Sequence, residues 1–171
     1  LLETNYFLDY QGVRFIALNS NVMIDEQMEW LETVLKNNPH KWTIAFFHHP
    51  LYSATTKRDF PERRKRWKPL FDKYGVDLAL QGHDHTYARG SESLYEKNLL
   101  TGTNIKDATG TVYVVSVSGP KQYDIKPSWD QYEATRHKAG ANKQLFQVIS
   151  IDGNKLSYRS VSYTHLTLPT I

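Results

Sequence analysis

The sequence has no cysteine among its 171 residues. This absence excludes disulfides, thiolate metal ligands and cysteine nucleophiles, so a metal site would have to be built from histidine, carboxylate or amide side chains. The apolar runs are strand-sized, and none reaches the roughly 20 residues of a membrane helix. The first residues also have neither the basic start nor the apolar stretch of a signal peptide. The sequence therefore predicts no membrane segment.

The chain also has only a small excess of positive over negative charge. Its 21 basic and 18 acidic residues leave a net charge of +3, a modest excess that favours an anionic substrate. Hydrophobic residues make up 40% and aromatic residues 13% of the composition, which excludes a disordered or fibrous protein. At this length we expect one domain with a packed core.

The first half of the chain alternates strand-like and helix-like segments. A Gln11-Gly12 turn between two β-rich runs predicts a hairpin. Two amphipathic helices follow, one with Asp25 as its N-cap and one with Pro61 in its first turn. Each helix is followed by an apolar run that suits a strand buried on both faces. The predicted strands cover residues 6–10, 13–18, 42–47 and 76–80. One predicted helix begins after Asp25 and is ended by residues 37–39, and the other runs from Pro61 to Gly75.

The second half has strand-like segments without helices between them. Residues 110–116, 144–151 and 156–161 predict antiparallel strands, and 152–154 predict a turn. Residues 117–143 contain Pro120, Pro127 and Gly140 and predict a long loop of the kind that borders a site. Residues 162–171 resemble a translated adapter, so we expect a non-native tail after residue 161.

Histidines follow two of the predicted buried strands at the point where each strand ends. Residues 48–49 follow the strand over 42–47, and residues 83–85 follow the strand over 76–80. Open α/β sheets place their ligands at this edge, so three imidazoles can meet there. Imidazole together with oxygen ligands suits zinc, iron or manganese. Each motif alone is a weak sign, because structural and surface histidines are commoner than metal ligands.

The spacing within each motif predicts which side chains can meet. If the chain is extended, His83 and His85 point to one face and Asp84 points elsewhere. Adjacent residues of a strand point to opposite faces, so only one of His48 and His49 would join the cluster.

Three stretches carry a family pattern: Phe47-His48-His49-Pro50-Leu51-Tyr52, Gly75-Val76-Asp77-Leu78-Ala79-Leu80 and Gly82-His83-Asp84-His85-Thr86-Tyr87-Ala88-Arg89. Together they resemble the calcineurin-like metallophosphoesterases, most of all the purple acid phosphatase branch. The stretch 110–123 is similar to bacterial members. The resemblance covers residues 5 to about 160. It implies an α/β fold of two packed β-sheets flanked by helices, the α/β/β/α metallophosphoesterase sandwich, here without its N-terminal part.

The resemblance implies metal-dependent hydrolysis of phosphate esters, with a phosphate monoester as the expected substrate. In that family two metal ions share a bridging carboxylate and stabilise the phosphoryl oxygens. By motif matching, His48 and His83 correspond to ligands of one metal and His85 to a ligand of the other. His49 and Arg58 are candidates for substrate binding. The implied cofactors are two divalent or trivalent transition metal ions: iron, zinc or manganese.

The sequence also departs from the family. The N-terminal motifs Asp-x-His, Gly-Asp-x-x and Gly-Asn-His-Asp/Glu, which supply the bridging carboxylate and further ligands, do not occur. Residues 1–161 are therefore expected to be the C-terminal portion of a phosphoesterase domain in a longer enzyme. Neutral histidines alone neutralise two metal ions poorly, so the isolated chain is expected to be inactive. The alternatives are a phosphodiesterase or nucleotidase of the same family, or a non-catalytic remnant with an incomplete metal site.

Basic residues concentrate between positions 57 and 68, a pattern that also occurs in nucleic-acid binding proteins. The solvated face of a helix explains most of this stretch, so we expect no nucleic-acid partner. An extracytoplasmic location is implied by the family resemblance alone.

Overall fold

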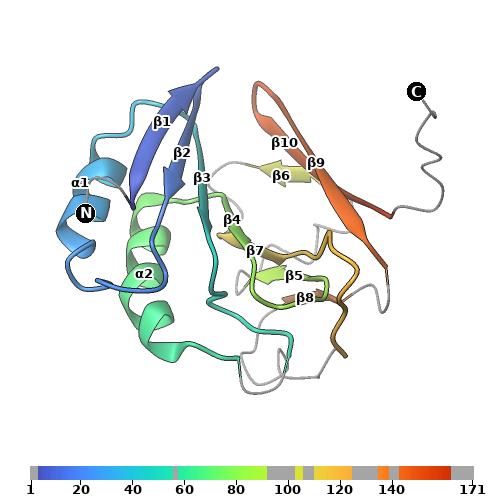
Figure 1. Ribbon diagram of the computed structural model, residues 1–171. Coiled ribbons are helices and arrows are strands. Elements are labelled where there is room, and N and C mark those ends of the chain that lie inside the picture. Colours follow the sequence, from blue (N-terminus) through green and yellow to red (C-terminus); the bar gives the residue numbers. More distant parts are fainter. Residues whose placement is uncertain are drawn as a thin grey trace, which may run out of the picture.

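The protein is described here by a computed structural model, which covers residues 4–55, 58–91, 103–105, 110–124, 135–138 and 143–162. Its elements are β1 (Tyr6–Tyr10), β2 (Val13–Ala17), α1 (Met28–Lys36), β3 (Trp42–Phe47), α2 (Pro61–Tyr74), β4 (Leu78–Gln81), β5 (Ala88–Ser91), β6 (Thr103–Ile105), β7 (Val112–Val115), β8 (Thr135–Lys138), β9 (Leu145–Asp152) and β10 (Lys155–Ser162). They form three layers (Figure 1). Helices α1 and α2 cover one face of a seven-stranded sheet of order β1-β2-β3-β4-β7-β5-β8, and a three-stranded sheet of order β6-β10-β9 covers the other. The predicted α/β class and the packing of two sheets are confirmed.

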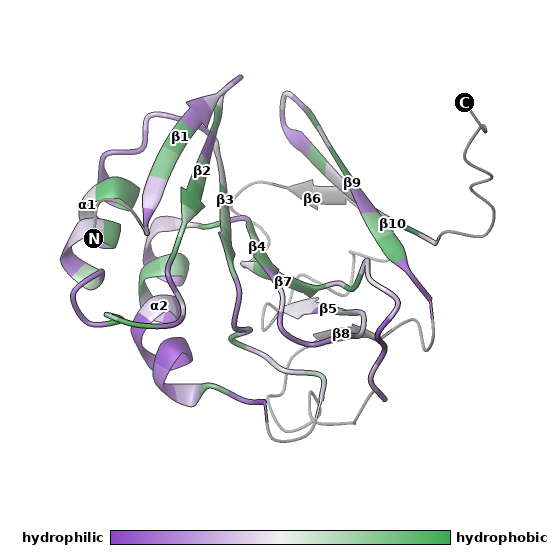
Figure 2. Ribbon diagram, viewed as in Figure 1, coloured by the Kyte–Doolittle hydropathy of each residue, from purple (hydrophilic) through white to green (hydrophobic). Residues whose placement is uncertain are grey.

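The central strands of the large sheet are buried on both faces, because successive side chains of a strand point in opposite directions. Ala45 of β3 and Ala79 of β4 pack in the cluster that contains the helices, while their neighbours Ile44 and Leu78 pack against the small sheet. Figure 2 shows the resulting apolar stretches along β3 and β7. This double burial explains why these strands are continuous apolar runs in the sequence.

The predicted hairpin and the second helix are confirmed. β1 and β2 pair antiparallel across the Gln11-Gly12 turn. α2 begins at Pro61 and ends at Gly75, whose φ of 65° lies in the left-handed region that glycine adopts without strain. β2, β3 and β4 are parallel neighbours, as the alternation of strands and helices predicts.

The predicted start of the first helix was wrong. α1 begins at Met28, and Gln27 rather than Asp25 occupies the N-cap position. The buried Gln27 side chain donates to the backbone carbonyl oxygens of Asn19, Val22 and Met23. It also accepts a hydrogen bond from the backbone N–H of Asn19. These contacts hold residues 19–23 in a loop next to Gln27, and the helix begins directly after it.

The prediction for the second half was wrong in two respects. β7 pairs parallel with β4 and antiparallel with β5, so it belongs to the mixed seven-stranded sheet and not to an antiparallel set with β9 and β10. The region 117–143 is not a continuous loop, because it contains β8, which pairs with β5. Both β5 and β8 are short and polar, so they lack the apolar alternation that marks a strand. Their place in the sheet is seen in the backbone pairing of β5 with β7 and with β8.

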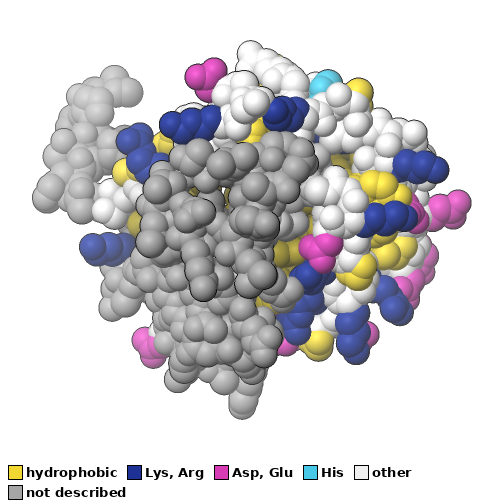
Figure 3. Space-filling model, turned by 180° about the vertical axis from the view of Figure 1, so that it is seen from behind, with side chains coloured by type: hydrophobic (Ala, Val, Ile, Leu, Met, Phe, Trp, Pro, Cys, Tyr) yellow, Lys and Arg dark blue, Asp and Glu magenta, His cyan; other side chains and the backbone are white. Residues whose placement is uncertain are grey.

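The basic stretch on α2 is largely neutralised within the chain. Arg64, Arg66 and Lys68 form ion pairs with Asp59, Asp25 and Asp72 respectively. On the face shown in Figure 3, basic and acidic side chains are interspersed. This supports the interpretation of the stretch as a solvated helix face. Within the described ranges, neither helix has the length and hydrophobicity needed to cross a membrane.

Candidate metal centre

Both histidine motifs lie at one edge of the large sheet, because β3 and β4 are parallel and each motif follows the end of its strand. The His48 Nε2 atom lies 3.0 Å from the His83 Nδ1 atom. One ring nitrogen each of His48, His49 and His83 lie within 4.8 Å of one another. The structure therefore brings three of the candidate histidines together, while His85 lies outside this group.

The backbone around Gly82 explains how His48 and His83 meet. The Gly82 N–H donates to the His48 carbonyl at 2.9 Å, and a Cβ atom on Gly82 would lie 3.3 Å from His48 Nδ1. The next residue, His83, has a φ of 67°, a left-handed conformation that is uncommon for a residue other than glycine. The chain thus approaches His48 closely and turns sharply.

Two geometric expectations from the sequence were therefore wrong. The left-handed His83 interrupts the extended conformation that would have put His83 and His85 on one face. β3 ends at Phe47, so the alternation of a strand no longer applies to His48 and His49, and both rings reach the same group.

His85 is oriented by the loop that follows β7. Its Nδ1 atom lies 3.1 Å from the Lys121 carbonyl oxygen, which only accepts hydrogen bonds. In the neutral ring the proton therefore sits on Nδ1, and the lone pair of Nε2 is free to bind a metal. Metal-binding histidines commonly donate their other ring N–H to a carbonyl in this way.

The electrostatic surroundings keep two of the rings neutral. Burial, followed by the charge of Arg58, lowers the pKa of His83 to about 4. Burial and the nearby Arg63 lower the pKa of His49 as well. The neutral imidazole is the form that binds metal ions, so both rings are in that form at neutral pH.

His49 and Arg58 are the candidates for substrate binding: His49 is one of the three grouped histidines, and Arg58 lies beside the group, at the His83 carbonyl. The Ser20 Oγ atom accepts from the His49 backbone N–H at 2.8 Å and lies 3.1 Å from His49 Nδ1. Arg58 Nη1 donates to the His83 carbonyl at 2.9 Å, and Nη2 donates to the Tyr123 hydroxyl at 3.3 Å. Phe60, which sequence reasoning missed, contacts both the His49 and His83 rings.

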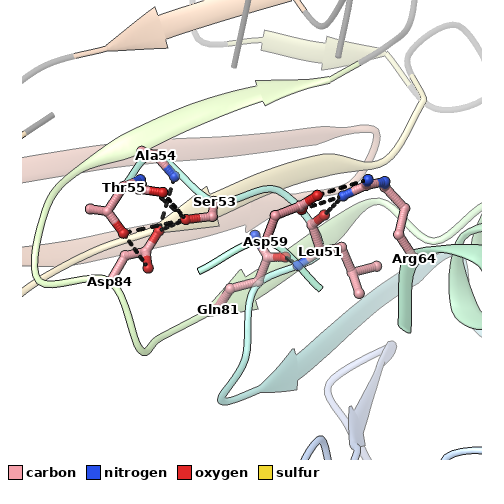
Figure 4. Close-up of polar contacts among 8 residues, drawn as sticks. All are labelled: Leu51, Ser53, Ala54, Thr55, Asp59, Arg64, Gln81 and Asp84. Atoms are coloured by element: carbon pink, nitrogen blue, oxygen red, sulfur yellow. Dashed lines mark hydrogen bonds and ion pairs between the residues drawn. The ribbon is translucent and has the colours of Figure 1, made fainter. Parts of the chain in front are cut away.

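Asp84 points away from the histidines, as the sequence predicts, and has a role that the sequence does not reveal. Its carboxylate is 2% exposed and accepts from Ser53 Oγ at 2.7 Å, the Ala54 N–H at 2.9 Å and Thr55 Oγ1 at 2.9 Å (Figure 4). It thereby ties the second histidine motif to the loop that follows the first. In the sequence, the only signal for this contact is that Asp84 is a polar residue between two histidines.

The donor set fits a transition metal in type, because imidazole nitrogen suits zinc, iron and manganese. It does not fit two such ions in charge. Among the residues that the structure describes, the group that could hold a metal consists of histidines alone, and the neighbouring Arg58 and Arg63 add positive charge. A complete two-metal site would need carboxylate ligands in addition.

Comparison with known families agrees with this geometry. The calcineurin-like phosphoesterase family matches residues 1–87, a stretch that includes both histidine motifs. The chain belongs to this family.

The similar proteins include acid phosphatases. The chain is 30% identical over 122 residues to purple acid phosphatase 15 of Arabidopsis thaliana, covering 67% of this chain and 21% of that protein. It is 27% identical over 125 residues to acid phosphatase type 7 of Homo sapiens, covering 61% and 28%. The chain thus spans between about a fifth and just over a quarter of the length of these relatives.

Two solved structures show the same fold. A purple acid phosphatase from yellow lupin (Lupinus luteus) seeds aligns with a TM-score of 0.63 at 22% identity, covering 91% of this chain and 30% of that one. GAP50, described as the anchor in the inner membrane complex of Plasmodium, aligns with a TM-score of 0.57 at 15% identity, covering 94% and 49%. Because the second protein is described as an anchor, the fold alone does not establish that a protein with this fold is an enzyme.

Proposed function

We propose that this chain supplies the histidine part of a two-metal site that hydrolyses phosphate monoesters. In this proposal His48 and His83 hold one ion, and His85 holds the other through Nε2. The observation that carries the proposal is the 3.0 Å approach of His48 Nε2 to His83 Nδ1, at the same sheet edge as a His85 whose Nδ1 proton is bound by a carbonyl.

The ions, when bound, would be iron, zinc or manganese and would polarise the phosphoryl oxygens and activate water. The chain's own residues bind and orient the phosphate. If the Ser20 hydroxyl donates to His49 Nδ1, then His49 Nε2 carries a proton that can be donated to a phosphate oxygen. Arg58 uses two of its five N–H groups within the protein, so donors remain for the phosphate as well.

The charge around the histidines supports a monoester rather than a diester. Arg58 and Arg63 both lie close enough to lower the pKa of a site histidine. A phosphate monoester carries up to two negative charges and a diester carries one, so the monoester gains more from this positive charge. We also propose that the missing carboxylate ligands come from another part of a longer protein, because the chain spans only 21% of purple acid phosphatase 15.

The test begins with metal binding, which needs no knowledge of the substrate. Zinc is titrated calorimetrically into the purified chain, and metal per chain is determined by elemental analysis. His48→Ala and His83→Ala should each weaken zinc binding at least about tenfold, because each removes a ligand. His40→Ala is the matched control, since His40 pairs with Asp9 rather than with the site. Zinc binding that both site variants leave unchanged would refute the assignment.

Activity is tested in the longer protein. There, His48→Ala and His85→Ala should abolish hydrolysis of p-nitrophenyl phosphate while the far-ultraviolet circular dichroism stays unchanged. Full activity with unchanged metal content would contradict the proposed function. His49→Ala should be less harmful than His48→Ala, and the opposite order would reverse the roles of these two histidines.

A further inference from the structure

A third loop borders the histidine motifs besides those that follow β3 and β4. β7 is parallel to β4 and ends at Val115, so the residues after it lie at the same sheet edge. The Tyr123 N–H donates to the His85 carbonyl at 2.8 Å, and the Lys121 carbonyl lies 3.1 Å from His85 Nδ1. These two contacts join the loop to the second histidine motif.

This loop gathers two cations around one aromatic ring. The Arg58 guanidinium carbon lies 4.7 Å from the centroid of the Tyr123 ring, and Lys121 Nζ lies 5.2 Å from it. Both distances are within the range of about 6 Å over which a cation is attracted to a ring face. Arg58 also donates to the Tyr123 hydroxyl. Tyr123 therefore holds two positive charges next to His83 and His85.

Neither cation is neutralised by a carboxylate in the part of the chain that the structure describes. Other basic side chains have such partners, for example Arg64 with Asp59 and Lys73 with Glu32. Asp84 lies near enough for Arg58 to favour its ionised form, but its oxygen atoms accept from Ser53, Ala54 and Thr55. The positive charge beside the histidines is thus available to an anion.

We propose that Arg58, Lys121 and Tyr123 form a second anion site, which binds a phosphate group on the leaving group of the substrate. The substrate class is then a phosphate ester or anhydride that carries a second phosphoryl group. Arg58 contacts the backbone of His83 as well as Tyr123, so it lies between the reacting phosphate and the second one. Its planar fork suits phosphate oxygens, and Lys121 adds a point charge. This inference rests on the proposed function for the position of the reacting phosphate.

The test compares two non-hydrolysable probes, methylenediphosphonate and methylphosphonate, by calorimetric titration of the whole chain with and without zinc. The diphosphonate should bind about tenfold more tightly, which is the effect of about one charge-assisted hydrogen bond. Arg58→Gln and Lys121→Gln should each remove most of this preference, while Arg58→Lys, which keeps the charge, should restore part of it. Lys155→Gln is the control, because Lys155 is exposed next to a turn that contacts Trp42 at the opposite end of β3.

Equal affinity for the two probes, or a preference that both glutamine variants leave intact, would overturn the inference. Its failure can be told apart from failure of the proposed function. Hydrolysis of p-nitrophenyl phosphate without any preference for the diphosphonate would refute the second anion site alone. A diphosphonate preference that Arg58→Gln and Lys121→Gln remove, in a longer protein without phosphoesterase activity, would refute the proposed function alone.

Discussion

Replacing Asp84 with alanine should destabilise the protein strongly, because it removes the shared acceptor of three buried donors. The carboxylate accepts from Ser53, Ala54 and Thr55 at 2.7 to 2.9 Å. A hydrogen bond to a charged group contributes about 1.5 to 3 kcal/mol, so three such bonds set an upper limit of about 9 kcal/mol. Burial offsets part of this, since it raises the pKa of Asp84. We therefore expect the free energy of unfolding to fall by about 4 kcal/mol, as in the breaking of a buried charged contact.

Asp84→Asn provides the matched comparison. Its carbonyl oxygen can still accept from Ser53 and Ala54, and its amide can donate to the Thr55 hydroxyl, which can rotate to accept. We expect a loss of only about 1 kcal/mol for this variant.

The two variants are compared by urea unfolding and by thermal unfolding, both followed by tryptophan fluorescence, because Trp42 and Trp67 are fully buried. For a chain of this length each kcal/mol corresponds to about 2 to 4 °C in Tm, so alanine should lower Tm by about 10 °C and asparagine by about 3 °C. Equal losses for the two variants, or a loss below about 1 kcal/mol for alanine, would refute the reasoning. A double-mutant cycle with Ser53→Ala would then isolate the contribution of that one contact.

Three further predictions concern Gly82, His83 and Asp9. Gly82→Ala should weaken zinc binding about tenfold in a calorimetric titration, because the added Cβ would lie 3.3 Å from His48 Nδ1. Gly119→Ala is the control: its Cβ would meet nothing within 4 Å, so zinc binding should stay unchanged. The pKa of His83 is lowered to about 4, so the folded state binds fewer protons than the unfolded state between pH 6.5 and 4. Stability measured by urea unfolding should therefore fall as the pH is lowered through this range, by well under about 3 kcal/mol because His83 is only partly buried, and His83→Gln should reduce that dependence. The hydrogen bond from Arg14 holds the pKa of Asp9 below its usual value of 3.8, so Asp9 stabilises the fold above that pH and loses its effect below it. Asp9→Asn should cost about 1 kcal/mol at pH 7 and less as the pH falls below 3.8, and an equal cost at pH 7 and pH 2 would contradict this account.

Much of the fold could be predicted because the relevant signals are local. The apolar run of β3, the proline that starts α2 and the glycine that ends it each act within a few residues. The start of α1 was missed, since it depends on the amide of Gln27, which bonds to residues up to eight positions away. β5 and β8 were missed because their partners are backbone groups of distant strands, which leave no pattern in the side chains.

The candidate site shows the same division. The sequence by itself determined that histidines follow two buried parallel strands, and hence that they share one edge of the sheet. Only the tertiary structure decided which nitrogen atoms meet. His48 and His83 are 35 residues apart, and their contact depends on a left-handed backbone at His83 and on the absence of a side chain at Gly82. The orientation of His85 likewise comes from a carbonyl on a loop 36 residues away. Such contacts arise from the packing of separate loops, which neither the period nor the composition of a short segment encodes.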